Sequence, residues 1–434
     1  MNKIKKHIGL LLVLIIICVF PISLSSQTKL SMKVIVTGIA VDKVGDNYKV
    51  TAQIVKTTPS TESAGSGAEI DFITDEGPTV ASAVSKLSYK AGKVSAFSHT
   101  SFIIIGNSVL DEDVTKCLDY FVRDKIIKNS ALVVVSEKEA SEEIKKTKQT
   151  ELSVGIGLQK VFLLKEKESD GIMMTIIDFL NENKKYSKSA TISQISLKSD
   201  SESSDVKGDS SGDSSNSGSE SSSSSGGESS SGGESSSSSS SSSGGTSGGG
   251  SSQSNYQYFE PQSAIACFVD GKFVGKLENE EEIMGYMLAY EMATSGDMVL
   301  DNIEEGMFSG SKFSVAIKKK SNNIKFRYEN EIPCVDVHVK IAKSSINEIL
   351  GEGIAEEPNF EEYDYLKKCF VKKIQESVAK CFTKSKEMGI DVFGAYDLAY
   401  KFHYNKTNKY YKDYSDFVDK LKLNVEVEIN TFDY

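Results

Sequence analysis

Residues 312–341 read KFSVAIKKKSNNIKFRYENEIPCVDVHVKI, and this stretch decides the fold of the chain's second half. Apolar and polar side chains alternate along it, as on strands that bury one face and leave the other in water. The apolar positions are Phe313, Val315, Ile317, Ile324, Phe326, Tyr328, Val335, Val337, Val339 and Ile341. Ser321, Asn322 and Asn323 are typical of a turn between strands. The stretch therefore predicts an antiparallel sheet with one solvated face.

A long amphipathic helix is predicted after this sheet. Its apolar positions recur every three or four residues, which places them on one helical face. They are Tyr363, Leu366, Phe370, Ile374, Val378 and Phe382. Gly389 is expected to end the helix, since glycine takes the left-handed C-cap conformation without strain. Residues 391–394 then lead into a short helix through Leu398, and residues 421–429 alternate as a closing strand. We assign residues 306–434 to a C-terminal α+β domain.

Residues 256–305 are predicted to form a small middle module. Two short apolar runs, 264–269 and 272–276, flank Asp270-Gly271, a dipeptide favoured in two-residue hairpin turns. Acids at its start predict a helix over 280–290.

The N-terminal part, residues 30–195, is expected to be an α/β domain. Alternating apolar residues between 33 and 55 predict a strand pair, and Pro78 is expected to open a helix. Two short apolar strands, at 102–105 and 131–135, enclose a helix predicted over 111–123, and a further helix is predicted over 172–180. Fully apolar strands on either side of a helix indicate a βαβ unit in a buried sheet.

Residues 201–254 consist almost entirely of serine, glycine and a few acids. Such a segment has too little apolar surface to offset the entropy lost on ordering, so we expect a disordered, flexible tether. The predicted fold is therefore mixed α/β and α+β. It has an N-terminal βαβ-containing domain and a C-terminal antiparallel sheet with a long helix, separated by a Ser/Gly tether.

The first 25 residues have the layout of a signal for export. Lys3, Lys5 and Lys6 precede an uncharged apolar run from Ile8 to Phe20, and small residues follow it. We expect a signal peptide cleaved near Ser25, or an uncleaved membrane anchor, with the rest of the chain exported. Two interpretations of Cys18 stay open: an apolar residue of a discarded peptide, or a lipidation site.

Composition excludes several classes of function. The 434-residue chain has a formal net charge of -11, which disfavours nucleic acid and anionic lipid as partners. Its four histidines are scattered, so we expect no metal site, and no catalytic or cofactor-binding motif is complete. We therefore predict that the protein is not an enzyme and holds no cofactor. Five cysteines are expected to be buried free thiols: Cys117, Cys267, Cys334, Cys369 and Cys381.

An ordered set of short motifs resembles the Ger(x)C family, the germinant-receptor C subunits of spore-forming Firmicutes. The motifs are TGIAVD at 37–42, YKVTAQI at 48–54, His99 with IIIG at 103–106, YFVRD at 120–124, AIACF at 264–268, GKFVG at 271–275 and MGIDVFG at 388–394. The alternating strand at the end of the chain completes the set. Family members usually carry a lipidated Cys followed by Trp-Asp, whereas residues 25–29 here read SSQTK.

The resemblance implies a non-enzymatic subunit of a nutrient germinant receptor, required for spore germination. It implies a place on the outer face of the spore inner membrane, beside integral-membrane A- and B-type subunits. It also implies a mixed α and β fold in three modules. The alternative is an exported adhesin or sensor ectodomain with a Ser-rich stalk, and less favoured is a secreted cell-wall enzyme.

The loop after Met388 is the candidate partner interface. Ile390, Asp391 and Phe393 crowd together there on an otherwise polar stretch. The other interpretation is structural: Ile390 and Phe393 attach the next helix to the core. The partner interpretation expects exposed side chains and a Phe393→Ala variant that melts normally, whereas the structural interpretation expects a packed Phe393 whose loss costs about 3–5 kcal/mol.

Overall fold

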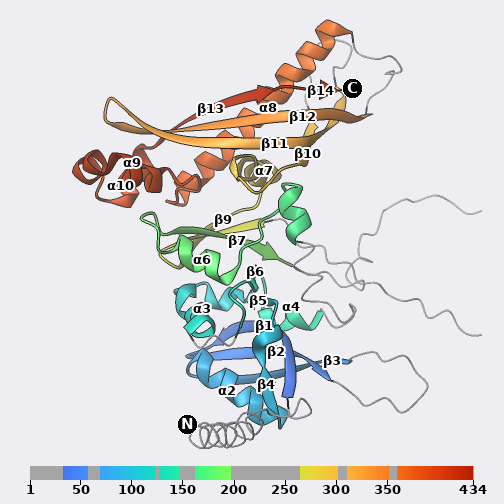
Figure 1. Cartoon of the computed structure of the whole chain (residues 1–434), viewed down its shortest axis with the longest axis vertical. Coiled ribbons are helices and arrows are strands. Elements are labelled where there is room, and N and C mark those ends of the chain that lie inside the picture. Colours follow the sequence, from blue (N-terminus) through green and yellow to red (C-terminus); the bar gives the residue numbers. More distant parts are fainter. Residues whose placement is uncertain are drawn as a thin grey trace, which may run out of the picture.

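The computed structural model describes residues 33–56, 69–123, 127–146, 162–196, 264–301, 310–350 and 359–433. Their strands form two sheets stacked along the long axis of the molecule (Figure 1). The predicted leader, with Cys18, and the predicted tether at 201–254 lie outside the described residues. Within the described ranges, no helix is long and apolar enough to cross a membrane.

The first sheet has nine strands within the described ranges, in the order β3-β2-β1-β5-β6-β7-β8-β9, with β4 paired to β1. The strands are β1 (Lys33–Val44), β2 (Asn47–Lys56), β3 (Glu69–Gly77), β4 (Val94–Ala96), β5 (Phe102–Ile105), β6 (Leu132–Ser136), β7 (Ser189–Ile195), β8 (Ala264–Val269) and β9 (Lys272–Leu277). Pairing is parallel among β1, β5, β6 and β7, and antiparallel toward both edges. The predicted hairpin is confirmed: Asp270 and Gly271 both have positive φ.

The predicted βαβ unit is confirmed as β5–α3–β6, whose two strands pair in parallel. The helices of this half are α2 (Val80–Ala91), α3 (Val114–Arg123), α4 (Ala140–Lys146) and α6 (Ile176–Glu182), with 3-10 turns at Phe97–His99 and Asn107–Val109. Three predicted helix starts were early. Thr79, not Pro78, precedes α2 and caps it, and Asp113 precedes α3 and accepts from the N–H of Thr115. Residues 172–175 are extended, because Thr175 bridges Leu132 of β6.

The second sheet comprises β10 (Gly296–Leu300), β11 (Lys312–Glu329), β12 (Ile332–Leu350), β13 (Lys422–Ile429) and β14 (Phe432–Asp433). The predicted turn at residues 321–323 is wrong, since β11 runs through it and turns at Asn330-Glu331, both at positive φ. The antiparallel arrangement holds for β10, β11 and β12. The closing strand β13 instead pairs in parallel with β12, because the helices between them return the chain to the same end of the sheet.

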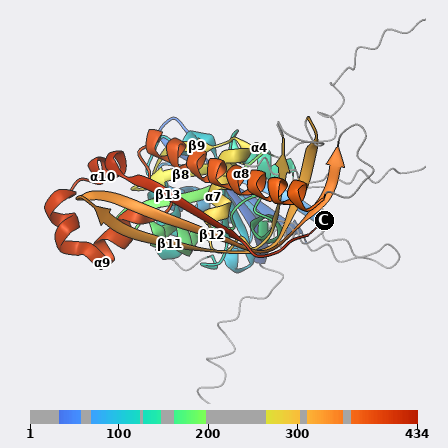
Figure 2. The same cartoon turned by 90° about the horizontal axis from the view of Figure 1, so that it is seen from above.

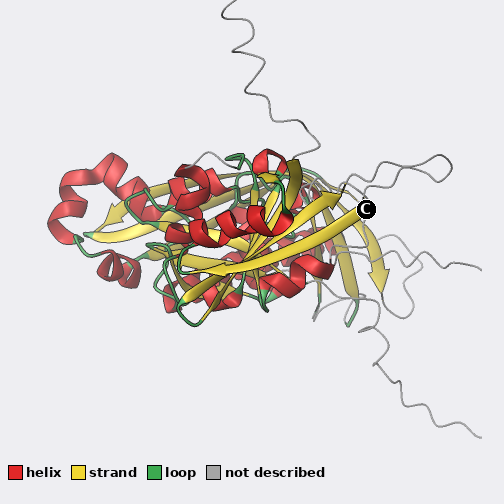
Figure 3. Ribbon diagram, turned by 90° about the horizontal axis from the view of Figure 1, so that it is seen from below, coloured by secondary structure: helices red, strands yellow, loops and turns green. Residues whose placement is uncertain are grey.

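Four helices accompany the second sheet: α7 (Glu280–Ala289), α8 (Phe360–Glu387), α9 (Ala395–Tyr410) and α10 (Tyr414–Lys420). Helix α8 lies across the sheet and buries its predicted apolar stripe there (Figure 2). Helices α9 and α10 extend from one end of the sheet (Figures 2 and 3). The short helix expected through Leu398 continues to Tyr410, with a kink at His403.

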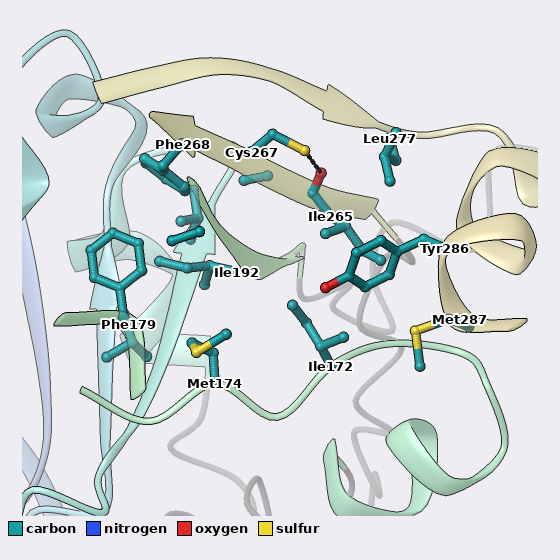
Figure 4. Close-up of a cluster of buried hydrophobic side chains, with 14 of the residues drawn as sticks. Ile172, Met174, Phe179, Ile192, Ile265, Cys267, Phe268, Leu277, Tyr286 and Met287 are labelled. Atoms are coloured by element: carbon teal, nitrogen blue, oxygen red, sulfur yellow. Dashed lines mark hydrogen bonds between the residues drawn. The ribbon is translucent and has the colours of Figure 1, made fainter. Parts of the chain in front are cut away.

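The described part of the predicted middle module, residues 264–301, contributes to both sheets. Its hairpin β8–β9 extends the first sheet, and β10 is an edge strand of the second. Helix α7 packs against α8 so closely that an added Cβ at Gly285 would lie 2.0 Å from the carbonyl oxygen of Ser377. One buried apolar cluster therefore continues from the first sheet through α7 to the second. Figure 4 shows the part of this cluster between the first sheet and α7.

Candidate functional site

The loop between α8 and α9 begins with a Schellman motif. Gly389 has φ +69°, and its N–H donates to the carbonyl of Lys386 at 3.0 Å. The N–H of Ile390 donates to the carbonyl of Ser385 at 2.9 Å. Both bonds satisfy carbonyls that the end of α8 leaves free. The predicted role of Gly389 is thus confirmed, and the motif aims the following residues back into the protein.

Asp391 holds the start of α9. Its carboxylate accepts hydrogen bonds from the N–H of Phe393 at 3.1 Å and of Tyr396 at 2.7 Å. Burial raises the pKa of Asp391 to about 6, and the backbone donors oppose that rise. The carboxylate therefore serves as a buried cap for the first turn of the helix.

The structure brings the three predicted interface residues together inside the protein. Ile390 is 1% exposed, Asp391 3% and Phe393 6%. The ring of Phe393 stacks on Phe382 of α8, with centroids 6.3 Å apart. Ile390 and Phe393 pack as the structural interpretation expects. Contact between this loop and a partner stays a prediction.

Hydrogen bonds from this region cross to the first sheet. Asp397 accepts from the backbone N–H of Ser187 at 3.0 Å and from its hydroxyl at 2.6 Å. The hydroxyl of Tyr414 lies 2.6 Å from the hydroxyl of Ser189 and accepts from the N–H of Asp391 at 2.6 Å. We call these five residues, Ser187, Ser189, Asp391, Asp397 and Tyr414, the joint. The joint fixes the end of α8 and the start of α9 relative to β7.

A cleft of about 610 Å³ opens beside the joint and is lined by both halves of the protein. Ile390, Asp391 and Phe393 form part of its wall, and Glu166 also lines it. Glu166 is buried, accepts from the N–H of Met173 at 3.1 Å and from the hydroxyl of Tyr290 at 3.3 Å, and burial raises its pKa. The cleft thus combines apolar walls with polar groups that already have protein partners.

Two side chains of β11 cap the C-terminal end of α7. The ammonium of Lys320 donates to the carbonyls of Leu288 at 3.3 Å and of Tyr290 at 3.0 Å, and Asn322 donates to the carbonyl of Ala289. These are the carbonyls that the end of a helix leaves unpaired, and a positive charge there is favourable. Burial nonetheless lowers the pKa of Lys320 to about 8. On the other side of α7, the hydroxyl of Tyr286 lies 2.9 Å from that of Thr191 (Figure 4 shows the Tyr286 side chain).

The described residues contain no group of side chains arranged to hold a metal ion. The five described cysteines are free, and all but the partly exposed Cys369 are buried. Burial raises the pKa of Cys117 and of Cys267 to about 12, so these thiols stay protonated and unreactive. His338 lies 2.8 Å from Glu426 on the solvated face of the second sheet.

Fold and joint define a two-sheet α+β protein whose halves are connected by side-chain hydrogen bonds. Residues 26–197 match the family described as spore germination protein N-terminal domain, and residues 263–432 match the family described as spore germination B3/GerAC like, C-terminal. The crystal structure of the GerBC protein has the same fold, with a TM-score of 0.50 at 15% identity over 91% of this chain and 96% of that one. A search of curated proteins gave no match.

The chain belongs to the Ger(x)C family of spore germination proteins and is a germinant-receptor C subunit. This family is a receptor-subunit family and not a known enzyme family.

Most residues of the joint were not predictable from the sequence. Ser187 and Asp397 are 210 residues apart, and nothing in their local sequence marks them as partners. Lys320 reads as one of three consecutive lysines, Lys318, Lys319 and Lys320. In the structure Lys320 is buried, whereas Lys318 and Lys319 are exposed. Only the position of Lys320 along the alternating pattern of β11 could have distinguished it from the other two lysines.

Proposed function

We propose that this chain is an exported, non-enzymatic C subunit of a nutrient germinant receptor on the outer face of the spore inner membrane. It works there beside integral-membrane A- and B-type subunits and is required for the response to germinants. The observation that carries the proposal is the pair of family matches, which cover both sheets in order. The basic and apolar segment just ahead of the first match supports export.

The joint suggests how the subunit takes part in the receptor. A partner segment that enters the cleft meets residues from both halves, including Ile390, Asp391 and Phe393. Binding there is sensitive to the relative position of the two sheets, because the cleft wall is formed by the loop that the joint holds. The predicted partner contact at these residues is therefore part of the proposal, with access from the cleft.

A deletion strain tests the function directly. We expect normal sporulation, loss or slowing of nutrient germination, and recovery when the wild-type gene is restored. Germination by a route that bypasses nutrient receptors should be unaffected and serves as the control. Normal nutrient germination in a strain without a paralogue would contradict the proposal, and would return the adhesin or sensor ectodomain to consideration.

Fractionation of spores tests the location. The protein should be recovered with the inner membrane, and expression should begin in the forespore. Recovery in the cytosol alone would refute the proposed place on the outer face.

A further inference from the structure

Helix α9 carries an unusual local composition for an acidic protein. Residues 400–412 read YKFHYNKTNKYYK, with four lysines and no acid. The lysines are Lys401, Lys406, Lys409 and Lys412, and all four are exposed. Between them, Phe402 is 65% exposed and Tyr404 is 55% exposed. We call these six residues the α9 patch.

The exposure of the two aromatic rings follows from how α9 is attached. His403 lies between them in sequence and packs against the rings of Phe326 and Tyr328, with centroids 5.7 Å and 5.8 Å away. Its carbonyl also accepts from the buried hydroxyl of Thr407 at 3.1 Å. Because His403 and Thr407 face the sheet, the neighbouring Phe402 and Tyr404 face solvent. Their exposure is therefore imposed by the packing of the inner face.

The lysines of the patch are available to an outside partner. No ion pair joins any of the four to another residue of the described ranges. Lys401 lies 5.1 Å from the centre of the Phe402 ring, and Lys409 donates to the hydroxyl of Tyr410 at 2.8 Å. Two nearby acids are engaged elsewhere: Asp397 in the joint, and Asp413 at the start of α10, where it accepts from the N–H of Ser415 at 3.2 Å.

We propose that the α9 patch docks on an anionic lipid bilayer. Lysines attract acidic headgroups, and exposed Phe and Tyr rings enter the boundary between headgroups and acyl chains. The net charge of -11 predicts repulsion from such a surface. Charges more than about 8 Å from the bilayer are screened at physiological salt, however, so the local patch decides the contact. Helix α9 also lies at an extremity of the molecule, where a flat surface can reach it (Figures 2 and 3).

Docking of α9 deepens the proposed membrane location and rests on it for its biological setting. It differs from attachment through the leader, because residues 400–412 are far from residues 1–25 in sequence. The chain from residue 26 onward contains every described residue and neither the apolar leader nor Cys18. Binding of that chain to vesicles therefore reports on the folded part of the protein.

The test is co-sedimentation of this chain with phosphatidylcholine vesicles, with and without phosphatidylglycerol. We expect binding only to vesicles with the anionic lipid, and loss of binding at high salt. Each lysine near such a surface contributes about fivefold in affinity. The variant with Lys401, Lys406, Lys409 and Lys412 all changed to Gln should bind at least about 25-fold more weakly even if only two of them lie against the bilayer.

A matched control changes four exposed lysines elsewhere, Lys312, Lys318, Lys319 and Lys368, to Gln and should bind as the wild type does. Because the chain has no Trp, Phe402→Trp supplies a single reporter whose emission should shift to the blue on anionic vesicles. Equal losses in the two lysine variants, or no blue shift, would overturn the docking of this patch. So would a patch variant that binds vesicles normally but fails in germination, which would instead indicate an acidic protein partner. Vesicle binding uses purified protein, so its failure is separable from failure of the deletion test.

Discussion

Replacement of Asp391 by Asn isolates the cost of burying its charge. The N–H groups of Phe393 and Tyr396 donate to different carboxylate oxygens of Asp391. Asn keeps one acceptor oxygen, so it can serve one of these N–H groups but not both, and it cannot ionise. Replacement by Ala removes both the charge and the acceptor. The two variants therefore separate the capping of α9 from the titration of a carboxyl that is only 3% exposed.

The expected magnitude follows from the pKa. The folded protein raises the pKa of Asp391 from its ordinary 3.8 to about 6, a shift equivalent to about 3 kcal/mol. Because the native state binds the proton more tightly than the unfolded chain, this contribution is fully present below pH 3.8 and is lost as the pH rises through about 6. At neutral pH, Asp391→Asn gains stability from loss of the buried charge and loses one of the two capping bonds. Asp391→Ala should be about 1–2 kcal/mol less stable than Asp391→Asn, because it also loses the remaining capping bond.

Urea unfolding followed by far-ultraviolet circular dichroism measures both effects. The free energy of unfolding of the wild type minus that of Asp391→Asn should fall by about 3 kcal/mol from below pH 4 to pH 7. Other titrating groups cancel in this difference because both proteins carry them. A difference that is constant across this range would refute the reasoning about burial. Equal stability of the Ala and Asn variants would refute the capping role.

Three further predictions concern the contacts around the joint. Burial lowers the pKa of Lys320 from its ordinary 10.5 to about 8, so the unfolded chain binds that proton more tightly than the native state does. The free energy of unfolding should therefore rise by about 3 kcal/mol as the pH rises from about 8 to 10.5. Lys320→Met should lack this rise in urea titrations, and a rise that persists would contradict the assignment. Gly285→Ala should lower the free energy of unfolding by about 1–3 kcal/mol, because the added Cβ meets the Ser377 carbonyl. This loss should exceed the gain from the better helix propensity of Ala. An unchanged melting temperature would show that α7 and α8 separate freely. Phe393→Ala should cost about 3–5 kcal/mol in urea unfolding. A folded, stable Phe393→Ala that no longer co-purifies with membrane partners would favour the interface role over the core role.

The local elements were predictable because neighbouring residues determine them. Asp270-Gly271 sits at a two-residue hairpin turn, where both residues need positive φ. Gly389 ends α8 for the same reason, and the predicted stripe residues Leu366, Phe370, Ile374 and Val378 are on the buried face of that helix. In each case the signal lies within a few residues of its effect.

The failed turn at Ser321, Asn322 and Asn323 shows the limit of that logic. Polar residues favour a turn when water is their alternative partner. Here Asn322 donates to the carbonyl of Ala289 at the end of α7, and Lys320 donates to the carbonyls on either side of it. Tertiary partners that are 30 or more residues away in sequence therefore keep these polar residues in a continuous strand. The parallel pairing of β13 with β12 was also not predictable, because the alternation of apolar and polar residues does not encode strand direction.

The candidate site was predictable only in part. The crowding of Ile390, Asp391 and Phe393 left two interpretations open, an exposed partner site and a packed loop, and the structure buries all three residues. It did not indicate Ser187 or Tyr414, whose bonds depend on the arrangement of the two sheets. The lysines and aromatic residues of α9 were visible in the sequence. Their availability was not, because it depends on His403 facing inward.

Two buried charges, Asp391 in the joint and Lys320 at the end of α7, make the connection between the sheets sensitive to its geometry. Asp391 destabilises the native state when ionised, above a pH of about 6, and Lys320 does so when protonated, below a pH of about 8. Between these values both are charged and buried, so both depend on the backbone groups that solvate them. A displacement of α7 or α9 removes those groups and leaves a buried charge without a partner, which is strongly unfavourable. Buried charges of this kind add little to stability, but they disfavour any other arrangement of the two sheets. If they act independently, the double variant Asp391→Asn with Lys320→Met should show the sum of the two single effects, and a large departure would mean that the joint and the end of α7 move together.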